Sequence, residues 1–110
     1  MTQEVIGVQT SNGNVFADLG LENSDELLVK AELARKISNI ITQQQMTQAE
    51  AAKLLDIDQP KLSALINGKL AGFSIMHLFR FLNAFDQDVE IVVKTTPLSD
   101  SQARTRVVAL

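Results

Sequence analysis

The sequence contains no cysteine and a single histidine, His77, so several kinds of chemistry lack the residues they need. Without cysteine there can be no disulfide, no thiolate metal ligand and no cysteine nucleophile. His77 has no partner at a spacing suited to metal binding or acid–base catalysis, which makes it a structural or surface residue. A glycine-rich phosphate loop is also missing. We therefore expect a protein that is not an enzyme, with no catalytic residue, no metal and no cofactor.

Long hydrophobic runs are absent too, although hydrophobic residues make up 45% of the 110 residues. A membrane span needs roughly 20 consecutive apolar residues. The first ten residues lack the basic start and the apolar stretch of a signal peptide. Because compact domains usually have about 100 to 150 residues, the length suits one domain. We expect a soluble, cytoplasmic protein with no membrane partner.

The net charge of −3 is unexpected for a nucleic-acid-binding protein, but the charge is unevenly distributed. Residues 1–26 contain five carboxylates and no lysine or arginine. Residues 27–46 and 47–82 each carry more positive than negative side chains. The acidic segment allows two interpretations, a solvated tail that promotes disorder or a surface for a basic partner. Its turn signal at Asn12–Gly13 fits a weak hairpin and a flexible arm equally well.

Helical periodicity begins after this segment. Capping side chains and first-turn acids around Ser24, followed by apolar residues at helical spacing, predict a helix over about 24–43. Within it, Glu26 precedes Lys30 by four residues, and Glu32 precedes Lys36 by the same interval. Such pairs stabilise a helix by a few tenths of a kcal/mol each.

Two short helices should follow. The sequence Thr47–Glu50 forms a capping box, in which the Thr hydroxyl and the Glu carboxylate satisfy backbone N–H groups, and it predicts a helix from Gln48 to near Leu55. Asp58 can cap a third helix over about 59–66, which tolerates a proline in its first turn. Asn67–Gly68 then ends this helix, because glycine adopts positive φ without a steric penalty.

A fourth helix, capped by Ser74, has apolar residues on more than one face, which predicts burial on two sides and makes a partner subunit a candidate for the second. Beyond it, Val89 to Lys94 is rich in β-branched residues and predicts a strand. A lone strand leaves its backbone unpaired. Three partners stay open for it: Val5 to Gln9, the pair Val107–Val108, or the same strand of a second molecule.

The two short helices can cross steeply only if the contact residue is small and the inward positions are apolar. The inward pattern is supplied by Ala51, Ala52, Leu55, Ile57, Leu62 and Leu65. The residues left outside on the third helix combine an amide, a cation, a hydroxyl and a methyl group, all able to meet base edges: Gln59, Lys61, Ser63 and Ala64. A helix-turn-helix that binds DNA and a packing unit without a ligand remain equally good interpretations of this pattern.

The stretch MTQAEAAKLLDIDQPKLSALINGK, residues 46–69, resembles the helix-turn-helix of phage-repressor-like (XRE) regulators, often written TQxxxAxxLGxxQxxxSxxxxG. The resemblance implies phosphate contacts, which set the register on DNA, from Gln48, Asn67 and Lys69. It implies that the residues facing the major groove are Gln59, Pro60, Lys61, Ser63 and Ala64. Asp56 stands where the family usually has a turn glycine, but Asp tolerates the left-handed conformation better than most residues.

A longer stretch, residues 14–94, is similar to antitoxins of the HigA type in bacterial toxin-antitoxin pairs. Its flanks read NVFADLGLENSDELLVKAELARKI and NGKLAGFSIMHLFRFLNAFDQDVEIVVK. The resemblance implies a dimer that represses its own operon and holds a small toxin, commonly an mRNA-cleaving ribonuclease, inactive. The acidic segment would suit the basic surface of such a toxin. The candidate toxin contacts are Val15, Phe16, Asp18 and Leu19.

We therefore expect a mainly α protein, a phage-repressor-like helix-turn-helix bundle of four to five helices with a C-terminal β-strand, pairing in a dimer. Its parts are an acidic N-terminal arm (1–22), a DNA-binding and dimerisation domain (23–94) and a loose C-terminal tail (95–110). The expected partners are double-stranded operator DNA, a cognate toxin and a second copy. The rival functions are a stand-alone XRE-family repressor without a toxin and a pure protein-interaction module.

Overall fold

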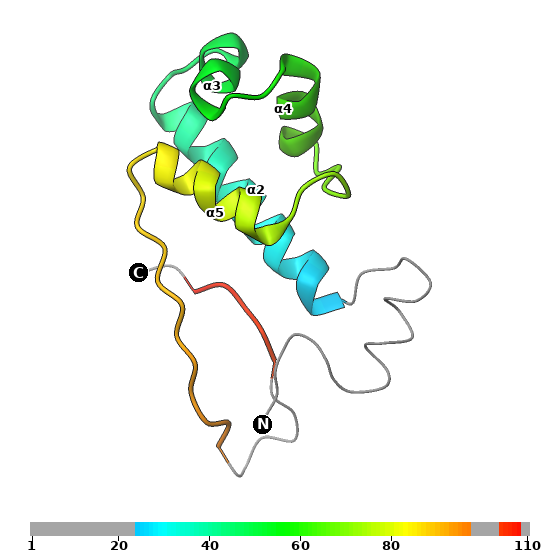
Figure 1. Ribbon diagram of the computed structural model, residues 1–110, viewed down its shortest axis with the longest axis vertical. Helices are drawn as coiled ribbons and strands as arrows, with labels where there is room; N and C mark the ends of the chain where they lie inside the picture. Colours follow the sequence, from blue (N-terminus) through cyan, green and yellow to red (C-terminus); the bar gives the residue numbers. More distant parts are fainter. Residues whose placement is uncertain (1–23, 98–103, 109–110) are drawn as a thin grey trace.

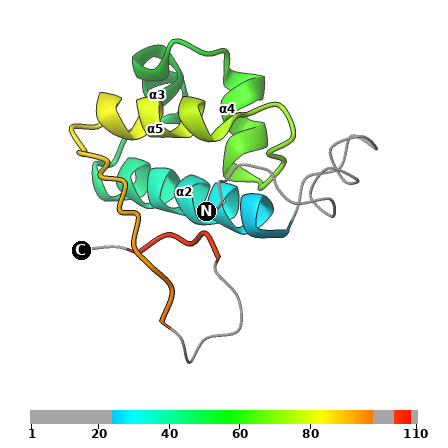
Figure 2. The ribbon, with the colours of Figure 1, turned by 60° about the horizontal axis from the view of Figure 1, so that its bottom comes forward.

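The computed structural model describes residues 24–97 and 104–108. Within this part of the chain there are four helices, α2 (Ser24–Gln43), α3 (Gln48–Leu55), α4 (Gln59–Ile66) and α5 (Ile75–Ala84). The long helix α2 lies beside α5, and the two short helices pack at one end of this pair (Figures 1 and 2). The four helices expected from the sequence are confirmed, with nearly the expected bounds. No helix in the described residues is long and apolar enough to cross a membrane.

The ends of the short helices follow from local hydrogen bonds. The Thr47 backbone N–H donates to Glu50 Oε1 at 2.8 Å, and the Glu50 N–H donates to Thr47 Oγ1 at 3.1 Å, which is the predicted capping box. Asp58 Oδ1 accepts from the Lys61 N–H at 2.8 Å, and Ser74 Oγ accepts from the His77 N–H at 3.0 Å. All three predicted caps are confirmed, so these helix starts are determined by residues adjacent in sequence.

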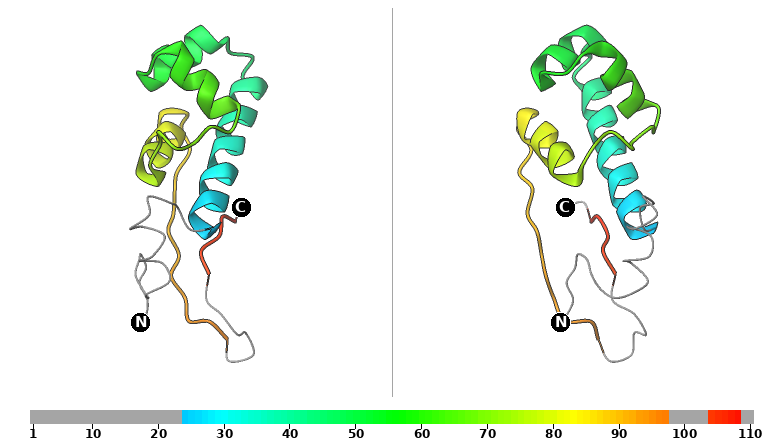
Figure 3. Two further views of the ribbon diagram at one scale, coloured as in Figure 1. Left: turned by 90° about the vertical axis from the view of Figure 1, so that its right-hand side faces the viewer. Right: turned by 45° about the vertical axis from the view of Figure 1, so that its right-hand side comes forward.

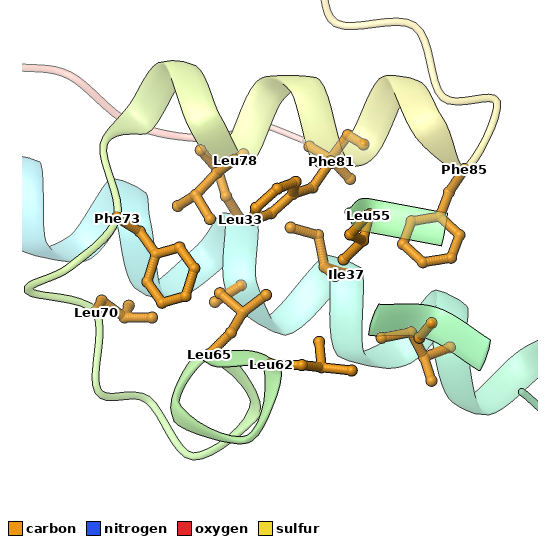
Figure 4. Close-up of a cluster of buried hydrophobic side chains, with 14 of the residues drawn as sticks. Leu33, Ile37, Leu55, Leu62, Leu65, Leu70, Phe73, Leu78, Phe81 and Phe85 are labelled. Atoms are coloured by element: carbon orange, nitrogen blue, oxygen red, sulfur yellow. The ribbon is translucent and has the colours of Figure 1, made fainter. Parts of the chain in front are cut away.

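One continuous hydrophobic core joins the four helices. Figure 4 shows Leu33 and Ile37 of α2 facing Leu78 and Phe81 of α5. The short helices and the loop before α5 complete the cluster with Leu55, Leu62, Leu65, Leu70 and Phe73. Because both short helices bury their apolar sides here, their orientation depends on the long helix beneath them.

The predicted ion pairs on α2 have mixed outcomes. Lys30 Nζ lies 3.9 Å from Glu26 Oε2, as the spacing of four residues indicates, and the Lys30 side chain is buried. Glu32, however, pairs with Arg35, three residues on, and not with the predicted Lys36. Residues three and four apart are both neighbours on a helix, and the planar Arg guanidinium suits a carboxylate better than the Lys ammonium.

The predicted strand at Val89 to Lys94 does not form within the described part of the chain. The segment leaves α5 as extended chain and passes alongside the helices without joining a sheet (Figures 1 and 3). Of its candidate partners, Val107–Val108 is described but makes no backbone hydrogen bond to it, and Val5 to Gln9 lies outside the described residues. A ladder needs a second backbone, and the described part of one chain does not supply it.

The outer side of α5 also differs from expectation. Leu78, Phe81 and Leu82 are buried, but Met76 on the opposite side is largely exposed. The second side predicted to be buried on this helix is not covered by the described part of the chain. Near the start of α2, part of the C-terminal segment makes a contact: the Thr105 N–H donates to Asp25 Oδ2 at 3.1 Å.

Candidate nucleic-acid interface

The steep crossing of α3 and α4 depends on two alanines. Ala51 is 0% exposed and Ala52 is 3% exposed, and both belong to the same core cluster as Leu62 and Leu65 of α4. Larger side chains at these positions would separate the two helices, because a packed core has no spare volume. The expected inward set of the helix-turn-helix is confirmed, with Ile57 half-buried against the core.

The turn between the two helices is made by Asp56. Its backbone has φ 58° and ψ 44°, the left-handed conformation in which the family usually has glycine. The Ile57 N–H donates to Ala52 O at 3.0 Å, so the turn closes over the end of α3. The expectation that an aspartate can replace the turn glycine is therefore confirmed. The corresponding left-handed residue after α4 is Gly68, with φ 79°.

Helix α4 presents a small polar surface away from the core. Leu62 and Leu65 point inward and are buried, whereas Gln59, Pro60 and Lys61 are exposed. Ser63 and Ala64 are half-buried on the same helix. The structure thus places on two turns of one helix the five residues for which the family resemblance implies a position in the major groove.

The three expected phosphate-contacting residues lie at the start of α3 and just after α4. Gln48 is the first residue of α3, and Asn67 and Lys69 follow α4; all three are exposed. Asn67 Nδ2 donates to Ser63 Oγ at 3.3 Å, and the Lys69 N–H donates to Ala64 O at 2.9 Å. The chain after α4 is therefore held against its last turn. An exposed helix flanked by amides and a lysine has the size and chemistry to enter a DNA groove.

Comparison with known proteins agrees with this geometry. A helix-turn-helix domain family matches residues 15–94. A solved structure described as an XRE family transcriptional regulator is 47% identical, covers 79% of this chain and 98% of its own, and superposes with a TM-score of 0.76. The chain belongs to the XRE family of helix-turn-helix transcriptional regulators. No curated protein has significant similarity to it.

Two carboxylates in the helix-turn-helix of this XRE-family regulator are engaged in helix caps. Glu50 accepts from the Thr47 N–H, and Asp58 accepts from the Lys61 N–H. A carboxylate at a helix N-terminus interacts favourably with the positive end of the helix dipole. This arrangement partly offsets the negative charge of the two acidic groups, and the exposed cations of the motif are Lys53, Lys61 and Lys69.

A groove of about 320 Å³ lies beside α4, between the end of α3 and α5. It is lined by apolar residues together with Asp56, Lys61, His77 and Arg80. The His77 ring lies parallel to that of Phe81, with centroids 6.0 Å apart, which agrees with a surface role for the only histidine. The described residues contain no cluster of potential metal ligands.

Some sequence-based site residues cannot be placed, and one relevant residue was not predicted. The candidate toxin contacts Val15, Phe16, Asp18 and Leu19 lie outside the described residues. Phe73, in contrast, contacts Lys61 of α4: the Lys61 ammonium lies 5.3 Å from the centre of the Phe73 ring. The contact joins α4 to a residue of the loop before α5. No periodic pattern in the sequence indicates it, so only the tertiary structure reveals it.

Proposed function

We propose that this regulator binds a palindromic operator as a homodimer and represses transcription, acting by binding alone without catalysis, metal or cofactor. One observation carries the proposal: α4 exposes Gln59, Pro60 and Lys61, while its buried Leu62 and Leu65 hold it in the core shared with α2 and α3. Such a helix fits the major groove, where amide side chains pair with adenine and methyl groups contact thymine.

The extended segment after α5 supports a dimer. Ile91, Val92 and Val93 are 72%, 77% and 92% exposed, which is unusual for consecutive β-branched residues. Their backbone also lacks a ladder partner within the described chain. Pairing with the same segment of a second copy would bury the side chains and satisfy the backbone. A two-fold axis then places two α4 helices about 34 Å apart, one turn of DNA.

The overall charge also favours two copies acting together. At −3, the net charge of the chain provides no long-range attraction to the negatively charged DNA backbone. Specific contacts must therefore supply most of the affinity, and one short helix reads only a few base pairs. Joining two half-sites raises the affinity without any new kind of contact.

Gln59→Ala tests the recognition surface. We expect it to weaken binding to the correct operator by about 1 to 3 kcal/mol, because an amide bidentate to adenine is lost, and to change binding to random DNA much less. Gel shifts at several salt concentrations on both DNAs measure the difference. Gln87→Ala, after α5, is the matched control and should leave both affinities unchanged.

Two outcomes would contradict this assignment. Equal losses on operator and random DNA would show that Gln59 does not read a base. Absence of any salt-sensitive DNA binding by the unmodified protein would favour the pure protein-interaction module, because phosphate contacts make affinity fall steeply with salt.

A second candidate function is that of an antitoxin, in which the repressor also neutralises a toxin. The observation that favours it is the segment 1–26, with five carboxylates and no basic residue, which complements a basic RNA-binding protein. The candidate contacts in this segment remain Val15, Phe16, Asp18 and Leu19. A stand-alone repressor has no need of such a partner.

Deletion of residues 1–22 distinguishes the two functions. For an antitoxin, we expect the shortened protein to keep its operator affinity and to lose co-purification with the product of the neighbouring gene, since charge complementarity is removed. Co-expression followed by pull-down and a gel shift on the upstream DNA measures both. Retained co-purification would move the contact elsewhere, and a full-length protein that captures no neighbouring product would leave the stand-alone repressor.

A further inference from the structure

The Lys61 side chain has a defined place in the free protein. Its ammonium lies over the face of the Phe73 ring, 5.3 Å from the ring centre, within the range of a cation–π interaction. Lysine has a flexible four-carbon stem and loses much conformational freedom when its end is held in one place. The ring therefore restricts the Lys61 side chain of α4 already in the DNA-free protein.

The ring itself is well held. Phe73 is 3% exposed and packs edge-on against Phe81 of α5, with centroids 6.1 Å apart and planes at 77°. The Phe73 N–H donates to Leu70 O at 3.0 Å, which fixes the loop that carries the ring. Figure 4 shows Phe73 extending from this loop toward Leu65 of α4. A buried, packed ring is a stable platform for an exposed cation.

The position of Lys61 on α4 decides what it can reach. Lys61 and the buried Leu65 are four residues apart and lie on the same side of the helix, whereas Pro60 and Ala64 form the neighbouring, outward row. The Phe73 contact draws the ammonium toward the edge of the helix, away from the outward row. A cation at the edge of a helix in the groove meets the sugar-phosphate backbone more readily than a base edge, and its hydrogens on the solvent side stay available.

We propose that Phe73 is a positioning residue for DNA binding, which holds Lys61 at the flank of α4 so that its ammonium contacts a backbone phosphate. The proposal rests on the proposed operator binding and deepens it. Lys61 then contributes to register and salt dependence, and base reading on this helix falls to residues of the outward row and to Gln59.

The test combines Phe73→Leu and Lys61→Met, singly and together, with Phe85→Leu as the control for loss of a core ring that contacts neither Phe73 nor Lys61. Phe73→Leu should weaken operator binding about two- to fivefold when Lys61 is present and leave it unchanged in the Lys61→Met background. Lys61→Met should reduce the slope of log affinity against log salt by about 1, by the same amount on operator and mismatched DNA. Phe85→Leu should give equal effects in both backgrounds.

A purely structural role for Phe73 predicts something different. It would give the same loss of affinity with and without Lys61, and that result would overturn the proposal, as would a Lys61→Met effect confined to the correct operator. Proton NMR uses the unmodified protein, so its result does not depend on whether a variant folds. Ring currents of Phe73 should shift the Lys61 ε-methylene resonances upfield. Unshifted resonances would overturn the contact. Absence of operator binding would reject the proposed function itself, and this role of Phe73 with it, even if the upfield shift were seen.

Discussion

Replacing Ile91 by Asp is expected to convert the dimer to a monomer and to weaken operator binding by on the order of 100-fold, because two linked half-sites become one. Ile91 is the first of the three consecutive exposed β-branched residues through which we propose that two copies pair. In such a pair the new carboxylates would approach each other across the two-fold axis, and like charges opposite one another destabilise paired strands. Sedimentation measures the mass, and a gel shift measures the affinity.

Thr95→Asp provides the control for this change. It adds the same charge to the same extended segment, at an exposed position beyond the apolar residues, and should leave a dimer that binds its operator. An unchanged mass for the Ile91 variant would reject the segment as the dimer contact. A monomer with undiminished affinity would show instead that one recognition helix is sufficient.

Leu62→Ala is expected to lower the free energy of unfolding by about 2 to 5 kcal/mol. Leu62 is 0% exposed and lies on the inner side of α4, where it belongs to the core cluster shared with α2 and α3. Truncation removes apolar contacts and leaves a cavity that the short helices cannot fully close. Since domains of this size are stable by about 5 to 15 kcal/mol, the loss is a large part of the total. Urea denaturation followed by circular dichroism measures it.

The control is Leu54→Ala on α3. Leu54 is 46% exposed, so the same truncation should change stability much less. If the two variants were equally destabilised, the helix-turn-helix would not depend on the inward face of α4 for its stability. If Leu62→Ala were nearly neutral, the packing of α4 against the long helix would need to be revised.

Local interactions explain why the short helices were predictable. Each start has its cap within three residues, as with Thr47 and Glu50 or Asp58 and the Lys61 N–H. The turn at Asp56 is likewise decided by one residue that tolerates a left-handed backbone. Such interactions need no other part of the chain, so sequence spacing is enough to predict them.

The strand illustrates the opposite case. The residues Val89 to Lys94 have the composition of a strand, yet composition cannot provide the second backbone that a ladder requires. In the described part of one chain the segment is extended but unpaired. Whether it becomes a strand depends on assembly, which lies beyond the information in local sequence.

The sequence alone thus determined the four helices, their caps, the left-handed turn and the side of α4 that stays outside, because all of these depend on residues a few positions apart. Only the tertiary structure decided which cation pairs with Glu32, that α5 keeps one side exposed, and that Lys61 lies over Phe73. The Lys61 contact depends on how a loop brings a ring back to an earlier helix. Contacts between segments distant in sequence follow from packing of the whole core, which leaves no periodic pattern to read.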